Sequence, residues 1–184
     1  MDIRIATRQS PLALAQAEYV KSKLQQLHPK SHITLLKIQT TGDILLDTPL
    51  YTAGGKGLFI KQLEHALLDK RADIAVHSMK DVTVDLPGEL ALPVVMKRVD
   101  ANDVLVSHRY PTLNALPKKA IIGTASQRRQ AQLLIWRQDL NIKSCRGNLG
   151  TRLNKLAAGE YDALVLAAAG LKRLNLQTHI SERI

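Results

Sequence analysis

The sequence predicts an α/β protein built from two small domains, and three observations carry this prediction. Strand-like and helix-like segments alternate along the chain, which favours helices layered on a largely parallel sheet in each half. A polar stretch at residues 97–102 interrupts the alternation, and we expect a hinge at residues 98–102. The length of 184 residues accommodates two such domains, residues 1–97 and residues 103–184.

In the first half, Ser10 and Pro11 mark the start of a helix, because serine caps free N–H groups and proline is tolerated at the first helical position. Four glycines and a proline between residues 40 and 57 predict a mobile loop at about residues 42–57. The other expected elements are strands at residues 2–6, 32–38 and 74–76, and a helix at residues 58–68.

In the second half, Ser126 is the expected N-cap of a helix that follows a glycine-containing turn. The same alternation then continues to the end of the chain. The expected strands are residues 104–106, 121–122, 141–144 and 164–167, and the expected helices are residues 127–136, 151–158 and 168–174.

Composition narrows the classes of partner. The chain has 26 basic and 16 acidic residues, and a net charge of +10 favours an anionic ligand. Aromatic residues make up only 3% of the chain, which argues against a base-stacking surface for nucleic acid. The longest apolar runs are too short to cross a bilayer, the N-terminus shows no leader pattern, and the histidines and the cysteine lack metal-ligand spacing. A single cysteine fits a reducing compartment. We therefore expect a cytoplasmic monomer with no nucleic-acid, membrane or metal partner.

Basic residues fall at turns where a predicted strand passes into a predicted helix. Helix N-termini present free N–H groups, and arginine adds a planar fork that binds a carboxylate through two hydrogen bonds. The chain lacks the glycine-rich patterns of phosphate-binding loops, so a small ligand with several carboxylates is favoured. Solvated surface arginines are the alternative interpretation. The residues concerned are Arg8, Arg128, Arg129, Arg146 and Arg152, with Arg173 expected at the start of the last helix.

An acidic residue, Asp81, follows the predicted buried strand at residues 74–76 within the sequence HSMKD. A carboxylate among cations stays ionised, so Asp81 is a candidate to stabilise a developing positive charge or to move a proton. A solvent-exposed turn is the alternative. We interpret His77 as a packing residue and Cys145 as a small, partly buried apolar residue.

Several motifs, in order along the whole chain, closely resemble those of the hydroxymethylbilane synthases (porphobilinogen deaminases). They include RIATRQSPLALAQ, GGKGLF and AVHSMKDV in the first half, and IGTASQRR, RGNLGTR and AAGLKR in the second. This resemblance implies the fold of type II periplasmic binding proteins, with an active-site cleft between two domains and a smaller α+β domain at the C-terminus. It implies a transferase that condenses four porphobilinogens stepwise into hydroxymethylbilane, with release of ammonia, in tetrapyrrole (porphyrin and haem) biosynthesis.

The resemblance also implies site residues and a covalent dipyrromethane cofactor, with porphobilinogen and the growing oligopyrrole as partners. Asp81 matches the catalytic aspartate, and Lys56 lies in the active-site loop. The positions that bind the cofactor correspond to Ser78, Lys80, Asp81, Thr124, Ser126, Arg128, Arg129, Arg146 and Gly147. Those that bind substrate correspond to Arg8, Ser10, Arg146, Arg152 and Arg173. We expect the two sets to line one cleft.

The chain departs from the family pattern at its end. Ile184 precedes the family's third domain, which carries the cofactor on a cysteine, and Cys145 does not match that position. We therefore expect the chain alone to have little activity and no covalent cofactor, and its first domain to expose an unpaired strand edge. Two alternatives remain at this point: a non-catalytic polyanion-binding module of the same shape, in which a carboxylate such as Asp81 has no use, and a basic nucleic-acid binder.

Overall fold

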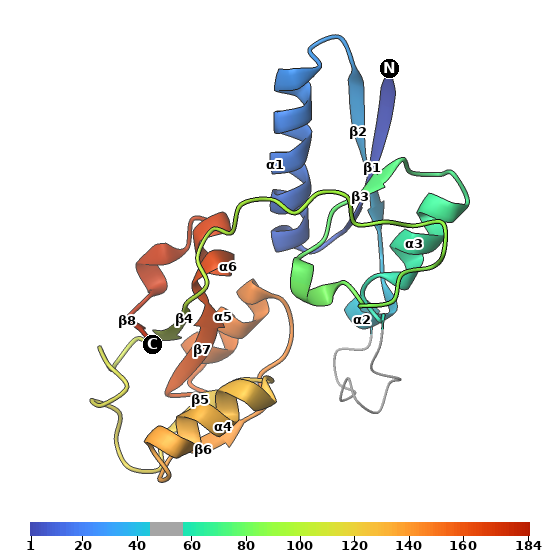
Figure 1. The fold of residues 1–184 in the computed structure, drawn as a ribbon. Coiled ribbons are helices and arrows are strands. Elements are labelled where there is room, and N and C mark those ends of the chain that lie inside the picture. Colours follow the sequence, from blue (N-terminus) through green and yellow to red (C-terminus); the bar gives the residue numbers. More distant parts are fainter. Residues whose placement is uncertain (45–56) are drawn as a thin grey trace. The chain divides into compact units, whose positions relative to one another are not determined.

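The computed structural model describes residues 1–44 and 57–184 (Figure 1). The chain forms two compact units, Met1–Lys97 and Arg98–Ile184, called unit 1 and unit 2 below. Most of the loop predicted at about residues 42–57, with Lys56, lies outside the described residues, so its mobility and role stay predictions.

Unit 1 is built on a small parallel sheet of order β2-β1-β3. Its elements are β1 (Asp2–Arg8), α1 (Pro11–Leu27), β2 (His32–Ile38), α2 (Thr41–Ile44), α3 (Lys61–Leu68), β3 (Ile74–Ala75) and the 3-10 turn η1 (Met79–Asp81). The predicted strands and both long helices are confirmed. The short helix α2 was not predicted and occupies the start of the expected loop, while α3 begins three residues later than residue 58.

Helices cover both faces of this sheet, and Figure 1 shows α1 and α3 on opposite sides of the strands. Adjacent residues of a strand point to opposite faces, so β1 contributes Ile5 to one core and Ala6 to the other. Ile5 packs with Ala17 of α1, whereas Ala6 packs with Leu63 of α3. The continuous apolar run of β1 therefore reflects burial on both sides of the sheet.

Unit 2 contains a five-stranded sheet of order β6-β5-β7-β4-β8. Its elements are β4 (Asp103–Val106), β5 (Ile121–Gly123), α4 (Gln127–Trp136), β6 (Asn141–Lys143), α5 (Leu149–Ala157), β7 (Ala163–Ala167), α6 (Ala168–Arg173), the 3-10 turn η2 (Gln177–His179) and β8 (Glu182–Arg183). The predicted helices and strands are present, and β8 is an addition that the sequence pattern did not predict.

The prediction of a largely parallel sheet in this half is only partly correct. Strands β6, β5 and β7 are parallel, but β4 runs antiparallel to both of its neighbours, β7 and β8. Because β4 is buried on both faces, its Val-Leu-Val sequence reads the same in either direction and gives no signal of orientation. Val104 faces the core under α5 and α6, and Leu105 faces the core under α4.

The segment predicted as a hinge makes hydrogen bonds and ion pairs with other residues of unit 2. Asp100, whose side chain is 7% exposed, accepts a hydrogen bond from Lys172 Nζ at 2.5 Å and lies 3.5 Å from Arg183 Nη1. The carbonyl of Asn102 accepts a hydrogen bond from the backbone N–H of Ala168. These contacts anchor residues 100–102 beside α6, and the hinge function of residues 98–102 stays a prediction.

Within the described residues, no helix combines the length and the apolar character needed to cross a membrane. The same residues contain no group of three or more His, Cys, Asp or Glu side chains arranged to hold a metal ion.

Candidate functional site in each unit

In unit 1, Arg8 is the centre of the candidate site. It ends β1 and binds the carboxylate of Asp43 with two nitrogens, Nε at 3.1 Å from Oδ2 and Nη2 on Oδ1. Its guanidinium carbon lies 4.3 Å from the centroid of the Phe59 ring, a cation–π contact. Its Nη1 is 4.0 Å from Oδ2 of Asp81. One arginine therefore joins two carboxylates and an aromatic face.

Local structure explains how these groups are held. Asp43 also accepts a hydrogen bond from Thr40 Oγ1 at 2.7 Å, so its carboxylate is fixed from two sides. The Phe59 ring packs on Gly42, where a Cβ atom would overlap the ring. Burial alone would raise the pKa of Asp43, but the hydrogen bonds from Arg8 and Thr40 outweigh burial and lower it. Asp43 is therefore ionised and a strong acceptor for Arg8.

The other predicted residues of unit 1 lie at the N-terminus of α1 and in the segment around η1. Ser78 Oγ donates to Gln16 Oε1 at 3.0 Å, Lys80 is exposed, and Ser10 Oγ caps α1 by accepting from the Ala13 N–H at 3.4 Å. Burial lowers the pKa of His77, with the Arg8 charge adding to the effect and Asp81 opposing it. His77 is thus neutral near pH 7, which agrees with the packing role predicted for it.

In unit 2, two arginines in the first turn of α4 share one carboxylate. Arg128 Nη2 donates to Asp103 Oδ2 at 2.9 Å, and Arg129 Nη2 donates to Asp103 Oδ1 at 2.7 Å. The turn before α4 is tight, because Thr124 Oγ1 accepts from the Ser126 N–H at 3.2 Å and Ser126 Oγ accepts from the Arg129 N–H at 3.4 Å. Ser126 is the predicted N-cap.

The turn before α5 brings further positive charge to this unit. Gly147 has a φ of +104°, a left-handed conformation that suits glycine, and its carbonyl accepts from Arg152 Nε at 2.9 Å. Burial lowers the pKa of Arg152, while the charges of Arg129 and Arg146 lower it further. The charges of Arg129 and Arg146 thus act on Arg152, which groups these three cationic side chains in one part of unit 2.

Two predicted residues have other surroundings than expected. Arg173 lies in the last turn of α6 and is exposed, so its prediction at the start of that helix is wrong. The helix begins at Ala168 as predicted, but it is only six residues long, so residue 173 falls in its last turn. Cys145 is 1% exposed, and burial raises the pKa of its thiol, so it is more deeply buried than predicted.

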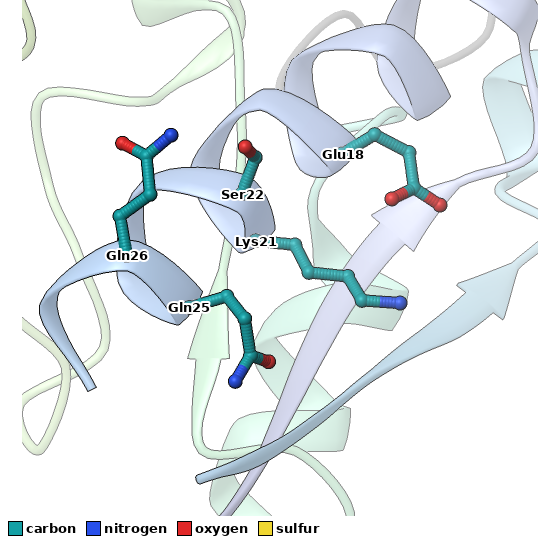
Figure 2. Close-up of a pocket in the computed structure, with 5 residues that line it drawn as sticks. All are labelled: Glu18, Lys21, Ser22, Gln25 and Gln26. Carbon is teal, nitrogen blue, oxygen red and sulfur yellow. The ribbon is translucent and has the colours of Figure 1, made fainter. Parts of the chain in front are cut away.

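Two shallow surface hollows lie away from these groups, at the C-terminal end of α1 and in the turn that follows. Figure 2 shows the first, lined by Glu18, Lys21, Ser22, Gln25 and Gln26. The Gln25 amide donates to the carbonyls of Pro29 and Ser31, both at 3.0 Å, and so stabilises the turn after the helix. This part of α1 has a structural role.

Sequence reasoning missed the two acidic partners, Asp43 and Asp103. Asp103 opens β4, and in a parallel sheet the start of a strand lies at the edge opposite the strand ends. Because β4 is antiparallel to β7, Asp103 instead pairs with Ala167 at the end of β7, on the edge that α4 enters. Asp43 stands in a Thr-Gly-Asp sequence before the predicted loop, and that spacing alone gives no partner.

Comparison with known proteins decides the family. A sequence model described as "Porphobilinogen deaminase, dipyromethane cofactor binding domain" matches residues 3–184. The chain belongs to this family. The family supports a function in tetrapyrrole synthesis and marks this part of the chain as a dipyrromethane-binding domain.

Solved structures agree on the fold. A periplasmic substrate-binding protein of an ABC transporter from Coxiella burnetii is similar with a TM-score of 0.54 and 13% identity, over 98% of this chain and 78% of that one. A nutrient-binding protein from Burkholderia cenocepacia, bound to methionine, is similar with a TM-score of 0.52 and 14% identity, over 98% and 78% of the two chains. These similarities confirm the predicted fold class, that of type II periplasmic binding proteins.

Proposed function

We propose that the chain is the pyrrole-binding and catalytic part of a hydroxymethylbilane synthase, which condenses porphobilinogens into hydroxymethylbilane and releases ammonia. The observation that carries the proposal is the family match over residues 3–184. The arrangement of charge supports it: an acidic side chain faces an arginine in unit 1, and excess positive charge gathers in unit 2.

The residues present fit a dipyrromethane, because that group bears acetate and propionate side chains. Carboxylates bound beside Arg152 would offset the repulsion that the charges of Arg129 and Arg146 exert on it. The residues that would hold the group are Ser78, Lys80, Thr124, Ser126, Arg128, Arg129, Arg146 and Gly147. When bound, the dipyrromethane supplies the pyrrole end on which the product grows.

Asp81 is the proposed catalytic residue. Its carboxylate is half-buried and lies 4.0 Å from Arg8 Nη1. Positive charge develops on a pyrrole nitrogen as ammonia leaves, and an oriented carboxylate stabilises that charge most when it is greatest. His77 is only partly exposed, and burial lowers its pKa, so its neutral ring does not take this task from Asp81.

Substrate carboxylates are assigned to the remaining arginines. Arg8, Arg146, Arg152 and Arg173 carry the charges for this role, and Ser10 acts through the backbone turn that its cap maintains. We extend the proposal to a monomeric, cytoplasmic protein that needs no metal, membrane or nucleic acid. The shared cleft formed by the residues of both units stays a prediction.

The alternative is a non-catalytic module that binds polyanions, and the similarity to nutrient-binding proteins favours it as the second candidate. The two candidates differ in the use of Asp81. Binding of carboxylates gains nothing from a nearby carboxylate, whereas departure of ammonia does.

The test uses a protein in which this chain is joined to the family's cofactor-carrying domain, because the chain alone is expected to have little activity. The cofactor-loaded protein is incubated with porphobilinogen, and ammonia and hydroxymethylbilane are measured, the latter as uroporphyrin after cyclisation and oxidation. We expect both products in the unsubstituted protein and neither above background in Asp81→Asn at matched cofactor content. Tight binding of porphobilinogen without release of ammonia would reject the enzyme in favour of the binding module.

A further inference from the structure

The carboxylate of Asp103 bridges two neighbouring arginines, one on each oxygen. Oδ1 accepts from Arg129 Nη2 at 2.7 Å, and Oδ2 accepts from Arg128 Nη2 at 2.9 Å. Only 15% of the Asp103 side chain is exposed, so the bridge is shielded from bulk water on most sides. Paired hydrogen bonds of this kind to a carboxylate are short and directional.

The two arginines differ in how they are held. Arg129 is 14% exposed, and its Nη1 donates to the Val165 carbonyl at 3.0 Å, so it is fixed against β7. Arg128 is 62% exposed, and its Nη1 donates to Gln132 Oε1 at 3.0 Å. Arg129 therefore holds the Asp103 carboxylate in place, whereas the Arg128 side chain extends into solvent.

We propose that Asp103 is a positioning residue that holds the Arg128 guanidinium in place for the carboxylate of the pyrrole ligand. Adjacent guanidinium groups repel each other, and an exposed arginine side chain is long and mobile. The bridge offsets the repulsion and restricts that mobility before the ligand arrives. This inference rests on the proposed function for the identity of the ligand, and on unit 2 alone for its geometry.

A positioning role for Asp103 and a purely electrostatic role predict opposite changes in ligand affinity when Asp103 loses its charge. Asp103→Asn makes this region more positive, so long-range attraction alone predicts tighter binding of an anion. Positioning predicts weaker binding, because the freed Arg128 must be ordered again when the ligand binds. Ordering one long side chain costs about 0.5–1.5 kcal/mol, so we expect binding to be about threefold to tenfold weaker.

The first measurement needs no ligand. Side-chain nitrogen NMR of the chain reports how freely each arginine Nε–H moves. We expect a restricted Arg128 signal in the unsubstituted chain and in the control Asp139→Asn, which breaks the Arg137–Asp139 ion pair at the other end of α4. In Asp103→Asn the Arg128 signal should become mobile. An equally restricted Arg128 in that variant contradicts the bridge.

The second measurement is calorimetric binding of a free dipyrromethane that bears acetate and propionate side chains, with its methyl ester as the probe that lacks carboxylates. We expect Asp103→Asn to weaken binding of the dipyrromethane, to leave the ester unaffected, and to have no further effect in an Arg128→Gln background. Asp103→Glu retains the charge beside Arg129, so it protects the fold, but displaces Arg128. We expect it to weaken binding to a smaller extent, and it replaces Asp103→Asn if that variant does not fold.

Tighter or unchanged binding in both variants, or an undiminished effect of Asp103→Asn in the Arg128→Gln background, would overturn the inference. Failure of the unsubstituted chain to bind the dipyrromethane in preference to its ester counts against the proposed function instead. In that case the NMR measurement alone decides whether Asp103 positions Arg128.

Discussion

The candidate sites of the two units differ in the ratio of arginines to carboxylates. In the candidate site of unit 1, one arginine, Arg8, meets two carboxylates, Asp43 and Asp81, so these three side chains carry no net positive charge. In unit 2, Arg128 and Arg129 share the single carboxylate of Asp103, and Arg146 and Arg152 add further positive charge. A region with balanced charge suits a reaction in which charge develops, whereas a region with excess positive charge suits the binding of anions.

On the proposed function, we expect substitutions in unit 1 to act mainly on rate and those in unit 2 mainly on affinity. The assignment has a physical basis, because a group that is complementary only to the transition state changes the rate constant, and a group that binds equally before and after changes affinity alone. Substitutions in each unit test this expectation.

The largest effect is expected from Asp81→Asn in the cofactor-loaded protein. Asparagine keeps the shape but removes the charge that stabilises a positive pyrrole nitrogen, so single-turnover rates should fall on the order of a hundredfold or more. Cofactor content, measured separately by absorbance, should be unchanged. Normal turnover, or failure through lost cofactor alone, would remove Asp81 from the catalytic role.

The matching variant in unit 2 is Arg146→Leu, which should act on binding. Losing a charged hydrogen-bond partner costs about 1.5–3 kcal/mol, so the affinity for the dipyrromethane should fall at least about tenfold. Loading of the unsubstituted and variant proteins with cofactor, followed by absorbance, measures this loss. A variant that loads fully but turns over slowly would contradict the division between the two units.

Next in size is Gly147→Ala, which tests the shape of the turn that carries the cationic cluster. Alanine is strained at a φ of +104°, and its Cβ would lie 2.8 Å from Thr151 Cγ2. We expect a loss of about 1–3 kcal/mol in the free energy of unfolding. Thermal or urea unfolding measures it, with Gly159→Ala as the control: it shares a positive φ, +79°, but has open space around it. Equal losses would show that backbone strain alone matters.

A smaller effect is expected on how the stability of unit 2 depends on acid pH. Burial would raise the pKa of Asp103, but hydrogen bonds from Arg129 and Arg128 lower it below 3.8. Its stabilising effect is therefore present above about pH 4 and is lost as the pH falls through the lowered value. We expect Asp103→Asn to be less stable at pH 7 by about 1–2 kcal/mol and to show a shallower acid limb.

The single tryptophan, Trp136, lies in α4 and reports on unit 2. Its fluorescence should follow the acid transition of Asp103→Asn, while Asp43→Asn in unit 1 should leave that transition in place. A shift of the Trp136 signal in both variants would mean that the units do not unfold separately.

The smallest expected signal is at Cys145. Its thiol is buried and its pKa is raised, so reaction with thiol reagents at pH 7 should be far slower than in denaturant. For the same reason we expect no pyrrole adduct at this sulfur after incubation with porphobilinogen. Intact-mass spectrometry checks both outcomes, and an adduct on Cys145 would place covalent chemistry in unit 2.

The sequence predicted most of the helices and strands because helix caps and apolar periodicity depend only on residues close together in the chain. Ser10 and Ser126 cap the helices they were expected to cap, and the apolar periods located the strands. Strand direction is not a local property, so the orientation of β4 was missed and Asp103 was missed with it. The start of α6 was predicted correctly, but Arg173 was assigned to the beginning of a helix so short that it falls in the last turn.

The antiparallel course of β4 also bears on the order in which the molecule assembles. Residues of β4 pair with residues of β7 about sixty positions later, as in the pairing of Val104 with Leu166, and with β8 still further along the chain. During synthesis, β1 meets β2 and β3 within the first 75 residues, so unit 1 has its partners early. Strand β4 cannot pair until residues 163–183 have left the ribosome. Its apolar residues are exposed during that interval, which makes β4 the segment where a chaperone has the most to protect.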